Sequence, residues 1–172
     1  MTSLFPHPPY AEDQPLSHEI LYLHVIRAGA MMGSVFPLIT APSSLLVSRY
    51  RHATAFNAST LIPRLLTHSA RGLVIGSIFG VVATFARMRG REEIEWKDRS
   101  WRLIENKGQV EQDWWTLEGA VVGVITGVLA ARRGKMPVGI GKAVLSGAGL
   151  GMASGFLGSV VWRQGVKGGK FE

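Results

Sequence analysis

The chain has 172 residues, enough for one domain, and its formal net charge is +7 at neutral pH. It contains no cysteine, which excludes a disulfide framework, a thiolate metal site and a cysteine nucleophile. A basic protein often binds nucleic acid, but here the basic residues lie at the ends of apolar segments, as they do in membrane proteins. We therefore expect no nucleic-acid partner.

The first 16 residues are expected to form an irregular arm, because their four prolines prevent a regular helix. No Lys or Arg precedes Arg27, so the arm resembles neither an Arg-rich presequence nor a secretory signal. If the protein enters an organelle, we expect an internal targeting signal.

Four apolar segments follow, at about residues 20–40, 72–86, 115–131 and 140–162. At about 1.5 Å per residue, helices of about 17–23 residues cover roughly 25–35 Å, which matches the apolar core of a bilayer. The predicted fold is an all-α membrane domain at residues 17–163, followed by a basic tail at residues 164–172.

Two longer polar connections separate the segments. Residues 48–71 are polar to amphipathic and carry four Arg. Residues 87–116 form a charged insert with seven basic and seven acidic residues and four of the five Trp residues. Tryptophan is common at membrane interfaces, so the insert is predicted to hold an amphipathic or interfacial helix.

Every apolar segment carries glycines at a spacing of four residues, which places them on one face of a helix. Such faces let helix backbones approach closely in lipid. We predict tight helix packing; the alternative is a glycine-lined cavity open to lipid or to a translocating chain. The predicted packing residues are Gly29, Gly33, Gly72, Gly76, Gly80, Gly119, Gly123, Gly127, Gly147, Gly151 and Gly155.

Three ionisable residues lie inside or near the predicted spans: Arg27, Glu118 and Lys142. They are candidates for an intramembrane ion pair or a lipid headgroup contact. An unpaired Arg in lipid costs at least about 2.5–3.5 kcal/mol, so Arg27 should pair with Glu19, a lipid phosphate or a neighbouring subunit. Glu118 and Lys142 are favoured as interfacial residues.

The loops after the first and third segments carry Arg and Lys but no acidic residue, whereas the arm is acidic and the insert is balanced. The positive-inside rule places these two loops on the cytoplasm-like side, and both termini and the insert on the other.

The motifs of common enzymes are not found in the sequence. The histidines have no metal-ligand spacing, and no GxSxG motif or strand-linked P-loop occurs. We expect no catalytic residue, no metal, no cofactor beyond structural phospholipid, and no small-molecule substrate.

The ladders GLVIGSIFG, GAVVGVITG and GAGLGMASG, with basic first and third loops, resemble the mitochondrial inner-membrane translocase channel family. The resemblance covers about residues 20–162. That family includes protein-import subunits and an accessory subunit of respiratory complex I. The resemblance implies a multi-pass protein of the mitochondrial inner membrane, with both termini in the intermembrane space.

Our leading expectation is a non-catalytic accessory subunit of a respiratory-chain complex, NADH:ubiquinone oxidoreductase (complex I), in its membrane arm. Its partners would be other membrane subunits and lipid, with the insert as a docking surface. A protein-import translocase subunit is the first alternative. A small-solute transporter, or a related peroxisomal or plastid membrane protein, is the second. The few Ser and Thr residues in the spans favour a structural role over a conducting pathway.

Overall fold

The computed structural model describes residues 2–169, and these residues form helices and loops without a strand. Six α-helices follow one another: α1 (Ser17–Val35), α2 (Pro37–His52), α3 (Ala58–Met88), α4 (Glu93–Glu105), α5 (Lys107–Arg132) and α6 (Ile140–Val161). One π-helical turn, η3 (Trp162–Val166), continues α6. The arm contains two short 3₁₀ turns, η1 (Thr2–Leu4) and η2 (Ala11–Asp13).

Four helical stretches are long and apolar enough to span a membrane: Ser17–His52, Ala58–Met88, Lys107–Arg132 and Ile140–Val166. Their most apolar windows have mean hydropathies between 1.5 and 1.6. The predicted fold class, an all-α protein with four membrane-spanning helices and a charged amphipathic insert, is confirmed.

The first helical stretch is longer than the predicted span at residues 20–40. Only Phe36 separates α1 from α2, and its backbone is itself helical. Pro37 is the first residue of α2, where the fixed φ of proline suits a helix, so the chain continues in helical conformation across the junction. The connection predicted at residues 48–71 is also largely helical. The Asn57 side chain accepts a hydrogen bond from the Thr60 N–H (3.1 Å) and caps α3 at its start.

The predicted insert at residues 87–116 divides into two parts. Only α4 is a separate amphipathic helix, with Trp96 and Ser100 buried on one face. The remainder belongs to α5, which begins at Lys107 because Asn106 caps it by accepting a hydrogen bond from the Gln109 N–H (3.1 Å). The polar residues before Trp115 are therefore the first turns of the third membrane helix.

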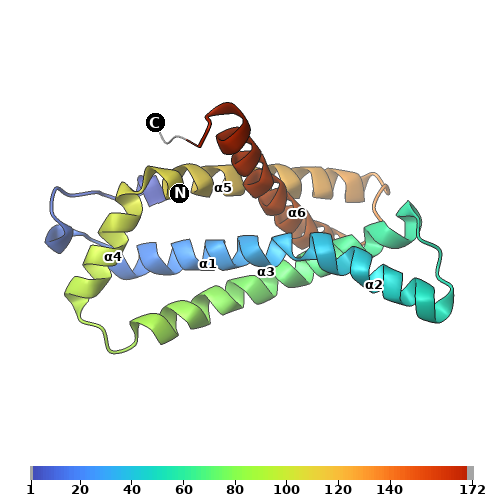
Figure 1. The fold of residues 1–172 in the computed structure, drawn as a ribbon, viewed down its shortest axis with the longest axis horizontal. Helices are drawn as coiled ribbons and strands as arrows, with labels where there is room; N and C mark the ends of the chain where they lie inside the picture. The colour runs from blue at the N-terminus through green and yellow to red at the C-terminus, as the bar shows by residue number, and fades with distance from the viewer. Residues whose placement is uncertain (1, 170–172) are drawn as a thin grey trace.

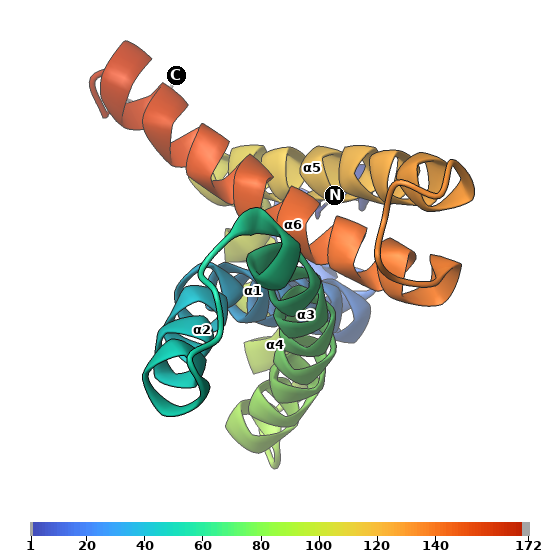
Figure 2. The ribbon, with the colours of Figure 1, turned by 90° about the vertical axis from the view of Figure 1, so that its right-hand side faces the viewer.

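The helices pack as two pairs, α1 with α3 and α5 with α6 (Figure 1). Helix α6 runs obliquely between α5 and the α1–α3 pair (Figure 2). Helix α4 lies at one end of the bundle, and the loop from α2 to α3 lies at the other (Figure 1). The arm packs against α4 at the first end, where the Trp101 Nε1 donates a hydrogen bond to the Pro8 carbonyl oxygen (2.9 Å).

Candidate functional site

The glycines of α1 and α3 face one another at the contact between these helices. A Cβ atom added to Gly29 would collide with the backbone of Gly76, and one added to Gly33 would collide with Gly72. Gly80 lies against the backbone of Val25 and Ile26. Any side chain at these positions would therefore force the two helices apart.

The second interface repeats this arrangement between α5 and α6. Successive steps of four residues along the two antiparallel helices place glycine against glycine or another backbone. The contacts are Gly119 with Gly151, Gly123 with Gly147, Gly127 with Ala143, and Gly155 with Trp115. Each predicted packing glycine thus lies at one of the two interfaces, and the structure shows which ladder faces which.

A group of small polar residues lies where the two helix pairs meet. Ser34 of α1, Ser69 of α3 and Ser146 of α6 are fully buried. Ser69 Oγ donates a hydrogen bond to the Ser146 carbonyl oxygen (3.3 Å). Gly149 of α6 packs against Ser69, and a Cβ atom added to Gly149 would collide with Ser69 Oγ. The spacing of four residues does not include Gly149, so its role as a packing residue was not predicted. The signal was its position between Gly147 and Gly151, two residues from each.

Arg27 forms an ion pair with Asp113 of α5. The distance from Arg27 Nη2 to Asp113 Oδ1 is 2.7 Å, and Arg27 Nη1 also donates a hydrogen bond to Thr116 Oγ1 (3.2 Å). The Asp113 side chain has no exposed surface, and that of Arg27 is 6% exposed. The suggested partners Glu19, lipid phosphate and a neighbouring subunit are therefore corrected to Asp113. The sequence pattern places Asp113 in the charged insert, because the third apolar segment begins only at about residue 115, whereas α5 begins at Lys107.

The N-terminal arm contacts this ion pair at one end of the bundle. Thr2 Oγ1 donates a hydrogen bond to Asp113 Oδ2 (3.0 Å), and Thr2 is fully buried. His24 Nδ1 lies 3.6 Å from Asp113 Oδ1. The Asp113 carboxylate therefore connects α5 to both α1 and the arm, which lie far from α5 in the sequence.

Glu118 and Lys142, the other two candidate residues, lie elsewhere. Both are exposed, and neither forms an ion pair with any of the residues 2–169. Glu118 lines a groove between α5 and α6, and Lys142 lines a smaller groove between α3 and α6. The structure does not bring either of them to Arg27.

A second polar contact joins the start of α1 to α4. Ser17 Oγ donates a hydrogen bond to Glu93 Oε1 (3.1 Å), and His18 Nε2 lies 2.8 Å from Glu93 Oε2. The His18 ring also stacks on Trp96, with ring centroids 3.9 Å apart. Hydrogen bonds from His18 and then from Ser17 hold the pKa of the Glu93 carboxyl below its usual range.

This lowered pKa predicts an acid-sensitive contact between α1 and α4. The stabilisation is fully present above the ordinary glutamate pKa of about 4.3 and is lost as the pH falls through the lower folded-state value. The protection of amides at the start of α1, measured relative to their intrinsic exchange rate at each pH, should therefore fall below about pH 4. The Glu93→Gln variant should lack this step, and an identical acid transition in that variant would contradict the assignment.

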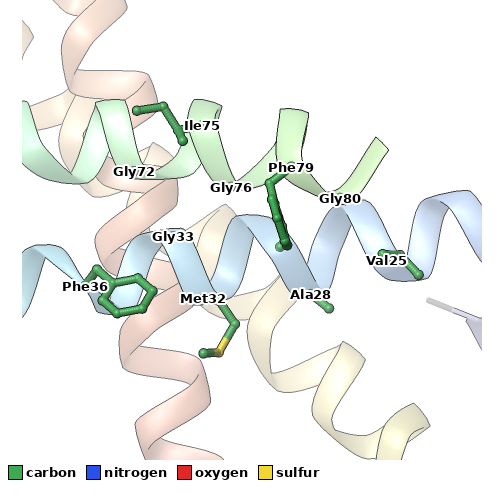
Figure 3. Close-up of a pocket in the computed structure, with 11 residues that line it drawn as sticks. Val25, Ala28, Met32, Gly33, Phe36, Gly72, Ile75, Gly76, Phe79 and Gly80 are labelled. Atoms are coloured by element: carbon green, nitrogen blue, oxygen red, sulfur yellow. The ribbon is translucent and has the colours of Figure 1, made fainter. Parts of the chain in front are cut away.

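Two grooves follow the glycine contacts of the helix pairs. The groove on α1 and α3 has a volume of about 670 Å³. The glycines form its floor, and large side chains project beside it, including Met32, Phe36 and Phe79 (Figure 3). The groove on α5 and α6 has a volume of about 700 Å³ and includes Glu118, Thr126 and Ser154. Within residues 2–169, no group of three metal-binding side chains gathers.

The fold and its buried contacts define the class as a multi-pass, all-α membrane protein built from two glycine-packed helix pairs. The chain belongs to the family described as "Protein of unknown function (DUF1757)", whose match covers residues 17–168. That match includes all four membrane-spanning stretches, α4, and both members of the Arg27–Asp113 pair. No curated protein matches the chain.

Proposed function

We propose that this protein is a non-catalytic structural subunit of a larger membrane assembly. The observation that carries the proposal is that polar side chains are buried inside the bundle, whereas large apolar side chains are exposed on its surface. Arg27 of α1 is buried and paired with Asp113. Ser34, Ser69 and Ser146 are buried where the helix pairs meet. The outer faces carry large apolar side chains, with Ile75 at 65% and Phe79 at 68% exposed. A bundle of this kind presents surface to lipid and to other membrane helices.

The resemblance to the translocase channel family makes the proposal specific. It points to the mitochondrial inner membrane and, within that family, to an accessory subunit of the membrane arm of respiratory complex I. In that role α4 and the arm dock on neighbouring subunits outside the membrane. The outward residues of α4, such as Arg102 and Glu105, would supply polar contacts at the rim of that interface.

A protein-import subunit is the second candidate, and one observation favours it. The groove between α5 and α6 contains the carboxylate of Glu118 and the hydroxyls of Thr126 and Ser154 within an apolar wall. Polar groups along an open groove would ease the passage of a polypeptide, since an extended chain needs hydrogen-bond partners in the membrane.

Native electrophoresis in mild detergent separates the two candidates. Tagged protein would be solubilised from mitochondria, and the proteins in its native band would be identified by mass spectrometry. Co-migration with NADH dehydrogenase subunits supports the accessory-subunit proposal. A smaller band that contains import components would overturn it in favour of the import role. Migration as the isolated chain would contradict both.

The orientation follows from the charge asymmetry of the loops. We expect both termini in the intermembrane space, because the two loops that lack acidic residues should face the matrix. A tag at the C-terminus should then be degraded by protease added to mitoplasts, whose outer membrane is open. A matrix protein should remain intact in the same sample. Protection of the tag would show that the orientation is wrong.

A further inference from the structure

The chain divides its charges unequally between the two ends of the bundle. The sequence contains no Asp or Glu between Glu19 and Glu92, and none between Glu118 and Glu172. The acidic residues within the described chain therefore lie in the arm, at the start of α1, in α4 and its N-cap Glu92, and in the first turns of α5. The opposite end holds Arg49, Arg51, Arg64, Arg71, Arg132, Arg133, Lys135 and Lys142, without a carboxylate among them.

Two of these cations lie at one groove between α3 and α6. Arg71 and Lys142 line it together with Thr67 and Ala70, and its apolar wall consists of Val74, Ile75 and Leu145. The groove has a volume of about 350 Å³. Neither the guanidinium of Arg71 nor the ammonium of Lys142 makes a hydrogen bond or an ion pair with any other described residue. By contrast, Arg64 is fixed to α2 through the Ser44 carbonyl oxygen (2.9 Å) and Ser48 Oγ (2.8 Å).

The groove lies beside a buried contact between its two helices. Ser69 of α3 donates its hydrogen bond to the Ser146 carbonyl oxygen, and the adjacent residues Ala70 and Leu145 line the groove. The position of the two cations relative to the apolar wall is therefore set by a buried contact rather than by surface side chains alone.

We propose that this groove binds an anionic phospholipid, with its phosphate between Arg71 and Lys142 and an acyl chain along Val74, Ile75 and Leu145. Two unpaired cations complement a phosphate, and the absence of carboxylates at this end removes any internal competitor. The exposed apolar wall distinguishes a lipid from free phosphate, which would leave that wall uncovered. The inference needs only the membrane fold, and it holds whether the protein is a respiratory or an import subunit.

The site can be tested by native mass spectrometry of the purified full chain in detergent. The probe is dioleoyl phosphatidylglycerol, and dioleoyl phosphatidylcholine serves as its neutral counterpart. We expect one phosphatidylglycerol to be retained preferentially. Because each cation near a lipid surface contributes about 1 kcal/mol, the Arg71→Gln/Lys142→Gln variant should retain this lipid about 10- to 30-fold more weakly.

The matched control is Arg132→Gln/Arg133→Gln, which removes two charges at the same end but outside this groove. It should retain phosphatidylglycerol as the unchanged protein does. A second variant, Leu145→Trp, fills the apolar wall and keeps both cations; it should also lose the lipid. Added inorganic phosphate should not displace the lipid.

Four outcomes would overturn the site. Equal weakening by the control pair would indicate diffuse electrostatic attraction, and full retention by the Arg71/Lys142 variant would exclude those cations. Displacement by inorganic phosphate, or full retention by Leu145→Trp, would show that the acyl chain does not lie in the groove. Circular dichroism and gel-filtration elution must match the unchanged protein, so that a loss of lipid is not a loss of fold.

Discussion

Replacing Gly123 with leucine is expected to separate α5 from α6 and to prevent stable assembly of the bundle. A Cβ atom at this position would collide with the carbonyl oxygen of Gly147, and the added atoms of leucine cannot avoid the partner backbone. Overpacking usually costs about 1–3 kcal/mol, and a clash against the backbone of the partner helix falls at or above the upper end of that range. Fluorescence-detected gel filtration in detergent would show loss of the monodisperse peak.

The matched control for Gly123→Leu is Gly141→Leu. Gly141 also lies in a membrane helix, but a Cβ atom there would meet open space. The same change of residue should therefore leave the elution profile and the thermal stability nearly unchanged. If Gly123→Leu elutes and unfolds like the control, close backbone contact at the α5–α6 interface is not required for the fold.

Removing the Asp113 carboxylate is expected to destabilise the protein strongly, because Arg27 would be left buried without its partner. Breaking a buried ion pair from one side typically costs about 3–5 kcal/mol. In a chain of this size we expect the Asp113→Leu variant to unfold roughly 10 °C below the unchanged protein. The apparent unfolding temperature in detergent, followed by circular dichroism, is the measurement.

Two further variants test whether the lost charge pair is the cause. The double variant Arg27→Leu/Asp113→Leu removes both charges and should recover most of the lost stability, since an apolar pair of similar size is often as stable as an ion pair. Glu118→Leu removes an exposed carboxylate from the same helix and should have little effect. A double variant as unstable as the single one would contradict this interpretation.

The same pair shows where sequence reasoning failed. Sequence analysis identified Arg27 as a deep charge that needs a partner, because an unpaired Arg is costly in lipid. It did not find Asp113, which lies 86 positions along the chain in a stretch that resembles the rest of the charged insert. Only the packing of α1 against α5 and the arm distinguishes this carboxylate from its solvated neighbours.

The all-α class and the four membrane-spanning segments were determined by the sequence itself. Hydrophobic length predicts a membrane span, and the spacing of glycines by four residues identifies the face of each helix that permits close contact. Both signals are local, since they depend on residues within one helix. The four spans and the positions of the packing glycines could therefore be predicted, although capping by Asn57 and Asn106 extended two helices beyond their apolar cores.

Which membrane helix packs against which was decided only by the tertiary structure. The glycine face of any membrane helix could pack against that of any other, because the four faces are chemically alike. The pairing of α1 with α3 and of α5 with α6 is accompanied by contacts that connect distant residues, such as Arg27 with Asp113 and Ser69 with Ser146. These contacts depend on side-chain geometry in three dimensions, which hydropathy and spacing along one chain do not encode.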